Sequence, residues 1–201
     1  MIIGIAGGSA SGKTTLLNQL SKQFGQEQLT LVSTDNYYYP LEKQQRDAKG
    51  ELNFDLPSAL NEGQLVNDIQ KLVNGHDVEL LEYTFNNPAL TPQIIIYKPA
   101  PVIIVEGLFV LHFPLLQPLL NYRVLIDAPE EVRLSRRLIR DEQERGYGKE
   151  EVCYQWNNHV KPAFDKYVFP YVNQVDLFIN SHDDFENGFQ QLVNFISKQL
   201  K

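Results

Sequence analysis

Residues 7–15 of the chain read Gly-Gly-Ser-Ala-Ser-Gly-Lys-Thr-Thr and follow directly on the apolar run Ile2–Ala6. This is a Walker A pattern between an expected strand and helix, and it predicts a loop whose backbone N–H groups converge on bound phosphate. Lys13 is expected on the outer phosphates and the Thr14 hydroxyl on a Mg²⁺ ion, where the helix adds its positive dipole end. The alternative is a plain glycine turn whose lysine faces solvent. The residues expected to bind a nucleoside triphosphate are Gly7, Gly8, Ser9, Ala10, Ser11, Gly12, Lys13, Thr14 and Thr15.

Length and composition favour one domain, residues 1–201, because 43% of the residues are apolar and can form a full core. The balance of 18 basic and 25 acidic residues opposes a nucleic-acid partner, which needs a positive surface. We expect neither export nor membrane insertion, since no long uninterrupted apolar segment occurs. The single cysteine, Cys153, favours a reducing compartment, and we therefore expect a cytoplasmic protein.

Apolar runs alternate with helical patterns along the chain, which predicts an α/β fold with a parallel sheet flanked by helices. The expected strands are Ile2–Ala6, Leu29–Ser33, Val102–Val105, Tyr122–Ile126 and Val175–Ile179. The expected helices are Lys13–Phe24, Ser58–Val73, Glu130–Arg145, Glu150–Tyr167 and Phe185–Leu200. Residues 78–98 differ, because Glu79–Phe85 and Gln93–Lys98 flank the chain breakers Asn86, Asn87 and Pro88 like the arms of a hairpin. We expect this hairpin to form a small flap on the substrate side.

Two carboxylates follow expected strands at the edge of the sheet where ligands bind. Asp35 comes two residues after Leu29–Ser33 and could accept the proton of an attacking hydroxyl. Glu106 ends the strand at Val102–Val105 like a Walker B carboxylate and, with Thr14, could hold Mg²⁺. The alternatives are an Asx-turn in which Asp35 or its neighbour caps the backbone, and simple solvent exposure of Glu106.

The helix expected over Glu130–Arg145 carries arginines at positions 133, 136, 137 and 140, which share one face. Guanidinium groups bind phosphate oxygens bidentately, so residues 129–148 could form a lid over the transferring group. The spacing of Arg137 with Asp141, and of Arg140 with Glu144, is equally typical of solvated ion pairs. The spacing alone leaves both interpretations open.

Taken together, these residues resemble the uridine kinase branch of the phosphoribulokinase/uridine kinase family over nearly the whole chain. The matching segments are Gly7–Thr15, Ser33–Tyr38, Asn53–Pro57, Tyr83, Glu106-Gly107, Arg133–Asp141, Glu144–Gly146 and Val160–Phe164. The resemblance implies a phosphotransferase that moves the γ-phosphate of ATP or GTP to the 5′-hydroxyl of uridine or cytidine, with Mg²⁺ as cofactor. It also implies a homo-oligomer.

The resemblance assigns roles to individual residues. It makes Asp35 the base for the 5′-hydroxyl, places Thr14 and Glu106 near Mg²⁺, and places Lys13 on the phosphates. The implied lid contacts to the triphosphate are Arg140 and Arg145. The implied ribose contacts are Asp55, Arg137 and Gln155, and the implied base-side contacts are Phe54, Tyr83 and Phe85. Tyr38, in the segment after Asp35, is a further candidate for substrate binding, with a loop anchor as the alternative. A site that hydrogen-bonds both ribose hydroxyls would reject deoxyribose, because its polar groups would be left unpaired.

Two positions depart from the family pattern: Pro88 stands where a histidine usually reads the pyrimidine edge, and Tyr147 where an arginine is usual. They leave the preferred base open, and with it another acceptor such as nicotinamide riboside, pantothenate or a sugar phosphate. A nucleotide-switch binding protein is a further alternative, although no Asn-Lys-x-Asp motif occurs. The four histidines have no metal-ligand spacing and receive no catalytic role, and Tyr154 and Trp156 are expected to pack.

Overall fold

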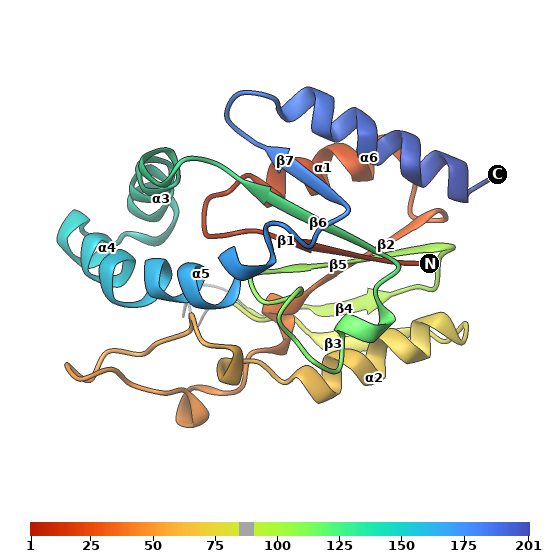
Figure 1. Cartoon of the computed structure of the whole chain (residues 1–201). Helices are drawn as coiled ribbons and strands as arrows, with labels where there is room; N and C mark the ends of the chain where they lie inside the picture. Colours follow the sequence, from red (N-terminus) through yellow and green to blue (C-terminus); the bar gives the residue numbers. More distant parts are fainter. Residues whose placement is uncertain (85–90) are drawn as a thin grey trace.

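The computed structural model describes residues 1–84 and 91–201, with the side chains of 144 and 145 excepted. Five parallel strands form one sheet in the order β2-β5-β1-β6-β7. Their bounds are Ile2–Ala6 (β1), Leu29–Ser33 (β2), Val102–Gly107 (β5), Tyr122–Asp127 (β6) and Leu177–Asn180 (β7). Helices lie on both faces (Figure 1), so the predicted α/β fold is confirmed.

The sheet is buried on both faces by two separate apolar cores. In β5, Val102 and Ile104 pack on one face while Ile103 and Val105 pack on the other, the two-residue alternation of a strand. The first core receives α1 (Lys13–Gln23) and α6 (Phe185–Gln199), and the second receives α2 (Glu62–Val73) and α5 (Lys161–Tyr167). Strands covered on both sides read as continuous apolar runs, which is why the sequence located them.

Strand β1 lies in the middle of the sheet between β5 and β6, so the loop after Ala6 leaves the sheet at its centre. Helices α3 (Glu130–Arg145) and α4 (Lys149–Gln155) lie beyond the same carboxyl ends (Figure 1). Helix α3 ends at Gly146, whose φ of 69° is left-handed and favours glycine. The layout places the Walker loop, the tips of β2 and β5, and the arginine-bearing helix at one edge.

Two predicted helices are interrupted in the structure. The helix expected from Ser58 begins as α2 only at Glu62, because Asn61 Oδ1 accepts the Gln64 N–H at 3.1 Å and caps it there. The helix expected over Glu150–Tyr167 is α4, a π-helical turn η5 (Trp156–Val160) and α5 in succession. The short 3₁₀ turns are η1 (Thr34–Tyr37), η2 (Leu41–Lys43), η3 (Pro57–Ala59), η4 (Gln117–Leu119) and η6 (Phe169–Tyr171).

The predicted hairpin is present as the antiparallel pair β3 (Val78–Leu81) and β4 (Ile94–Tyr97). Its arms are shorter than expected, and the breakers Asn86, Asn87 and Pro88 lie outside the described residues. The last strand begins at Leu177 rather than Val175. Among the helices of the described chain, none combines the length and the apolar character needed to cross a bilayer.

Candidate active site

The loop between β1 and α1 folds back on itself as a compact turn. Gly12 has a φ of 98° and Ala10 a φ of 60°, and the Ser11 N–H donates to the Gly8 carbonyl at 3.1 Å. A left-handed alanine costs about 1–2 kcal/mol, a strain that clusters at ligand sites. Glycine is required at position 7, because a Cβ there would lie 2.5 Å from the Ile126 carbonyl oxygen. The predicted strand–loop–helix setting of the Walker pattern is therefore present.

Lys13 is the first residue of α1, and its ammonium reaches back over the loop. Its Nζ donates to the Gly7 carbonyl at 2.8 Å and to the Gly8 carbonyl at 3.4 Å. The positive charge is thus held at the mouth of the loop rather than in solvent. A phosphate oxygen placed there would accept from the same ammonium and from the helix N-terminus.

Arg133 and Asp127 form an ion pair next to this loop. Arg133 Nε lies 3.1 Å from Asp127 Oδ1 and donates to the Ala128 carbonyl at 3.2 Å, while its guanidinium carbon lies 3.9 Å from the centre of the Phe164 ring. A Cβ on Gly8 would clash with Arg133 Nη1. Burial raises the pKa of Asp127, and the positive charges of Arg133 and Lys13 oppose that rise.

Sequence reasoning did not find the Arg133–Asp127 pair. The sequence predicts Arg133 as one of the arginines on a lid face, whereas its side chain is 6% exposed and contacts the loop next to Gly8. A signal was available, because Asp127 ends β6 at the same sheet edge as Asp35 and Glu106.

Asp35 lies in η1, two residues beyond the end of β2. Ser33 caps this turn, because its Oγ accepts the Asp35 N–H at 3.3 Å. The register pairs Ser33 with Glu106, so the tips of β2 and β5 are adjacent. Burial raises the pKa of Tyr97, and the charges of both Glu106 and Asp35 add to the rise. The two carboxylates therefore lie on the same side of the sheet edge, near the Tyr97 hydroxyl.

The donors expected for Mg²⁺ come from neighbouring elements. Glu106 pairs in register with Ile5 of β1, and Thr14 is the second residue of the helix that follows β1. Carboxylate and hydroxyl oxygens suit Mg²⁺, which takes few protein ligands when it also binds phosphates. Within the described residues, no group of three His, Cys, Asp or Glu side chains is placed to hold a metal ion. Thr14 and Glu106 fit an ion that shares its coordination sphere with a nucleotide.

Three of the aromatic residues expected on the acceptor side meet in one cluster. The Tyr38 ring lies 5.6 Å from the Phe54 ring, edge to face, and 5.0 Å from the Tyr83 ring. These rings come from segments that are far apart in sequence, and they offer an apolar surface to a planar ligand. Asp55 follows Phe54, and its N–H donates to Asn53 Oδ1 at 3.0 Å. Phe85 lies outside the described residues.

Asn36 ties the hairpin to this cluster, a role that sequence reasoning did not identify. Its Oδ1 accepts the Tyr83 N–H at 3.1 Å, and its Nδ2 donates to the Tyr97 hydroxyl at 2.9 Å. The side chain of Asn36 therefore connects η1 to Tyr83, which follows β3, and to Tyr97, the last residue of β4. No spacing rule connects residues 36, 83 and 97, so the sequence held no signal for it.

Arg137 links helix α3 to the Walker loop. Its Nη1 donates to Ser9 Oγ at 3.0 Å, its Nη2 donates to Gln155 Oε1 at 2.8 Å, and its Nε lies 3.0 Å from Asp141 Oδ2. Two of the residues expected on the ribose, Arg137 and Gln155, are thus in direct contact. The Arg137 guanidinium therefore reaches from α3 to the Walker loop.

The arginine face of α3 is not a simple row of solvated ion pairs. The pair of Arg137 with Asp141 is present, but Asp141 is fully buried and also accepts from Arg140 Nε at 2.8 Å. Arg136 instead donates to Ser181 Oγ at 3.0 Å. The side chains of Glu144 and Arg145 are outside the described part, so the expected role of Arg145 is not placed by geometry.

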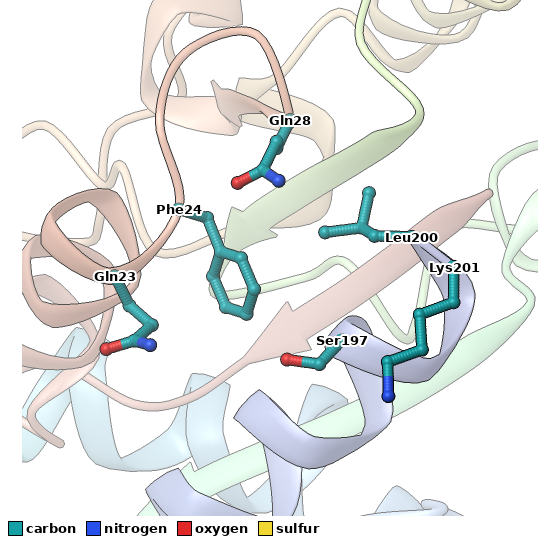
Figure 2. Close-up of a pocket in the computed structure, with 6 residues that line it drawn as sticks. All are labelled: Gln23, Phe24, Gln28, Ser197, Leu200 and Lys201. Carbon is teal, nitrogen blue, oxygen red and sulfur yellow. The ribbon is translucent and has the colours of Figure 1, made fainter.

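A separate hollow lies at the opposite edge of the sheet. Figure 2 shows it between the end of α1 and the last turn of α6. Its volume is about 320 Å³. Its lining residues are Gln23, Phe24, Gln28, Ser197, Leu200 and Lys201. None of them belongs to the candidate site, which is formed by loops around the strand tips.

Comparison with known proteins agrees with this geometry. Residues 2–186 match the phosphoribulokinase/uridine kinase family. Uridine kinase-like protein 5 of Arabidopsis thaliana is 36% identical over 99% of this chain and 43% of its own length, so the chain spans less than half of that relative. Uridine-cytidine kinase B of Dictyostelium discoideum is 33% identical over 99% of this chain and 82% of its own length.

A solved structure supports the same fold. Phosphoribulokinase from Rhodobacter spheroides superposes with a TM-score of 0.65 over 94% of this chain and 73% of its own, at 17% identity. At 17% identity this likeness supports the fold only. The family match and the relatives above 30% identity cover nearly the whole sequence. The chain belongs to the phosphoribulokinase/uridine kinase family.

Proposed function

We propose that the chain is a nucleoside kinase that transfers the γ-phosphate of ATP or GTP to the 5′-hydroxyl of uridine or cytidine. One observation carries the proposal: the Walker loop after β1 and the aromatic cluster Tyr38–Phe54–Tyr83 beyond β2 lie at the same edge of the sheet. A phosphate grip and a surface for a planar base are what a nucleoside kinase must bring together. The relatives named uridine kinase-like protein and uridine-cytidine kinase support a pyrimidine acceptor.

In the proposed reaction, the 5′-hydroxyl oxygen attacks the γ-phosphorus, its proton passes to Asp35, and the bond to the bridging oxygen breaks to release the nucleoside diphosphate. Asp35 suits this role because it follows β2 beside the phosphate edge. Lys13 stays on the phosphates, and Arg140 and Arg145 of the lid offset the charge of the transferring group. When bound, Mg²⁺ neutralises the phosphate oxygens, and Thr14 and Glu106 would hold it.

The ribose is proposed to bind between Asp55, Arg137 and Gln155. Arg137 supports this, because its guanidinium contacts Gln155 on one side and Ser9 of the Walker loop on the other. Vicinal hydroxyls that satisfy these polar groups would make the site select ribose over deoxyribose. The acceptor's base would lie against the aromatic cluster.

The proposal also places the protein in the cytosol as a homo-oligomer. The single cysteine supports a reducing compartment, and the family resemblance supports self-association. Size-exclusion chromatography with light scattering tests the assembly, and a mass equal to one chain would contradict it.

The test is an assay of the purified protein with ATP or GTP and a panel of acceptors: uridine, cytidine, their deoxy forms, nicotinamide riboside and pantothenate. We expect formation of UMP and CMP, with deoxynucleosides much poorer. Faster transfer to nicotinamide riboside or pantothenate would assign another acceptor, consistent with Pro88 and Tyr147. Slow nucleotide hydrolysis that no acceptor stimulates would overturn the proposal in favour of a nucleotide switch.

A further inference from the structure

Asp47 is the acceptor of four hydrogen bonds, two within its own loop and two from the helical segment that follows α3. Its Oδ1 accepts the backbone N–H groups of Lys49 at 2.8 Å and of Glu51 at 2.9 Å, both from its own loop. Its Oδ2 accepts the Tyr154 hydroxyl at 2.6 Å and lies 2.8 Å from Nε2 of His159, which is 3% exposed. Because an ionised carboxylate only accepts, Nε2 of His159 carries the proton.

The hydrogen bond from Tyr154 is the largest cause that lowers the pKa of Asp47, and the bond from His159 adds to it. The Lys49 ammonium lies over the Tyr154 ring, 4.2 Å from its centre, which is the geometry of a cation–π contact. The carboxylate therefore stays ionised at neutral pH and holds both segments at once.

The π-helical turn η5 makes this arrangement possible. In a regular α-helix, residues five apart point about 140° away from each other around the axis. A π-turn bonds i to i+5 and brings such residues back onto one face. Tyr154 lies in α4 one residue before its end, and His159 lies within η5. The two side chains meet the same carboxylate oxygen, with their rings 5.9 Å apart and nearly perpendicular. π-turns are rare and occur frequently at functional sites.

The two segments joined by Asp47 carry the residues proposed for the acceptor. On one side, residues 45–53 form a small hairpin in which Arg46 pairs with Leu52, and Phe54 and Asp55 follow directly. On the other side, Gln155 follows Tyr154 and contacts Arg137. Gln155 is covalently adjacent to Tyr154, and Phe54 and Asp55 directly follow the small hairpin that contains Asp47. Loosening the tie is therefore expected to change where this hairpin and the two residues after it lie relative to Gln155.

We propose that Asp47, Tyr154 and His159 form a clamp that positions the Phe54–Asp55 loop against Gln155 and thereby sets affinity for the acceptor nucleoside. The inference rests on the proposed function for what the loop binds, but the clamp itself is a property of the free protein. The three are positioning residues, since none of them is placed on the reacting atoms. The hydrogen bonds that form the clamp all lie on the acceptor side, and none of the four is made to a residue of the Walker loop.

The test compares Tyr154→Phe with Tyr171→Phe in the purified protein. Tyr171 is a matched control, because its hydroxyl also contacts a histidine, His112 Nδ1, at 3.1 Å, but away from the loop. Hydrogen exchange of the free protein is measured first, and Tyr154→Phe is expected to speed exchange at residues 45–55 while Tyr171→Phe does not. For Tyr154→Phe, KM for uridine is expected to rise about tenfold, the size of one hydrogen bond to a charged acceptor, with KM for ATP within about twofold.

Asp47→Asn provides a second variant, since an amide keeps only one accepting oxygen and cannot accept all four hydrogen bonds: its NH2 group would face either the two backbone N–H groups or Tyr154 and His159. We expect it to show the same exchange pattern and the same split between the two KM values. Unchanged exchange at residues 45–55 in Tyr154→Phe would overturn the clamp, and an equal rise in both KM values would overturn its acceptor role. A wild-type protein that phosphorylates no nucleoside contradicts the proposed function instead, while the exchange result still decides whether the clamp exists.

Discussion

Replacing Asp141 by alanine is expected to destabilise the protein severely. Asp141 is fully buried, and it pairs with Arg137 Nε at 3.0 Å and with Arg140 Nε at 2.8 Å. The side chain of Arg137 is only 7% exposed, so the variant leaves a buried guanidinium without its carboxylate. Breaking a buried pair by removing one partner costs about 3–5 kcal/mol. That is a large share of the ~5–15 kcal/mol by which a domain is stable.

Thermal unfolding measures the effect. For a chain of this size, 1 kcal/mol shifts Tm by about 2–4 °C, so Asp141→Ala is expected to lower Tm by about 6–20 °C. The control is Asp183→Ala, whose carboxylate is 68% exposed and lies 3.7 Å from His182. A surface pair contributes about 0–1 kcal/mol, and this variant is expected to shift Tm by no more than about 4 °C.

A double variant separates loss of the pair from loss of volume. Replacing Arg137 and Asp141 together by leucines removes both charges, and it is expected to recover part of the Tm lost by Asp141→Ala. If Asp141→Ala melts no lower than the Asp183→Ala control, the reasoning from the buried charge is refuted.

Three further perturbations test the acceptor side and the clamp. Phe54→Ala removes a ring of the aromatic cluster, and steady-state kinetics should show KM for uridine raised about tenfold with KM for ATP unchanged; equal effects on both would contradict an acceptor role. Asn36→Ala removes the acceptor of the Tyr83 N–H and the donor to the Tyr97 hydroxyl, so we expect faster hydrogen exchange of the Tyr83 amide. Protection of that amide equal to wild type would speak against the tie. Folding lowers the pKa of Asp47, so the stability that this carboxylate contributes is present above pH ~4 and is lost as the pH falls through its pKa in the folded protein. In urea titrations at a series of pH values, Asp47→Asn should therefore lose less stability at acid pH than the wild type. An equally steep acid loss in both proteins would argue against this.

Local patterns predicted the strands of the sheet and the extent of α3. The apolar runs located every strand of the parallel sheet, and the breakers around Gly146 gave the bounds of α3 as the structure has them. The sequence predicted the start of α2 at Ser58, four residues too early, because Asn61 caps the helix and α2 begins at Glu62. The π-turn at Trp156–Val160 leaves no trace in a pattern of apolar residues, so one continuous helix was expected.

Contacts between distant segments could not be predicted from spacing. Arg137 reaches Ser9 across 128 positions, and Asp47 reaches His159 across 112. Such partners depend on how α3 and the π-turn pack over the sheet, which no local rule specifies. Histidine spacing gave His159 no role for the same reason, although its partner lies on the loop that precedes Phe54 and Asp55.

The central claim is that a carboxylate beyond β2 accepts the proton of a nucleoside hydroxyl while the Walker loop holds the triphosphate. Its most direct test is transfer of radiolabelled γ-phosphate from ATP to uridine by the wild type and by Asp35→Asn under single-turnover conditions. We expect labelled UMP from the wild type, a rate about 10²–10⁴-fold lower for Asp35→Asn, and unchanged affinity for ATP. Equal rates for the two proteins would contradict it.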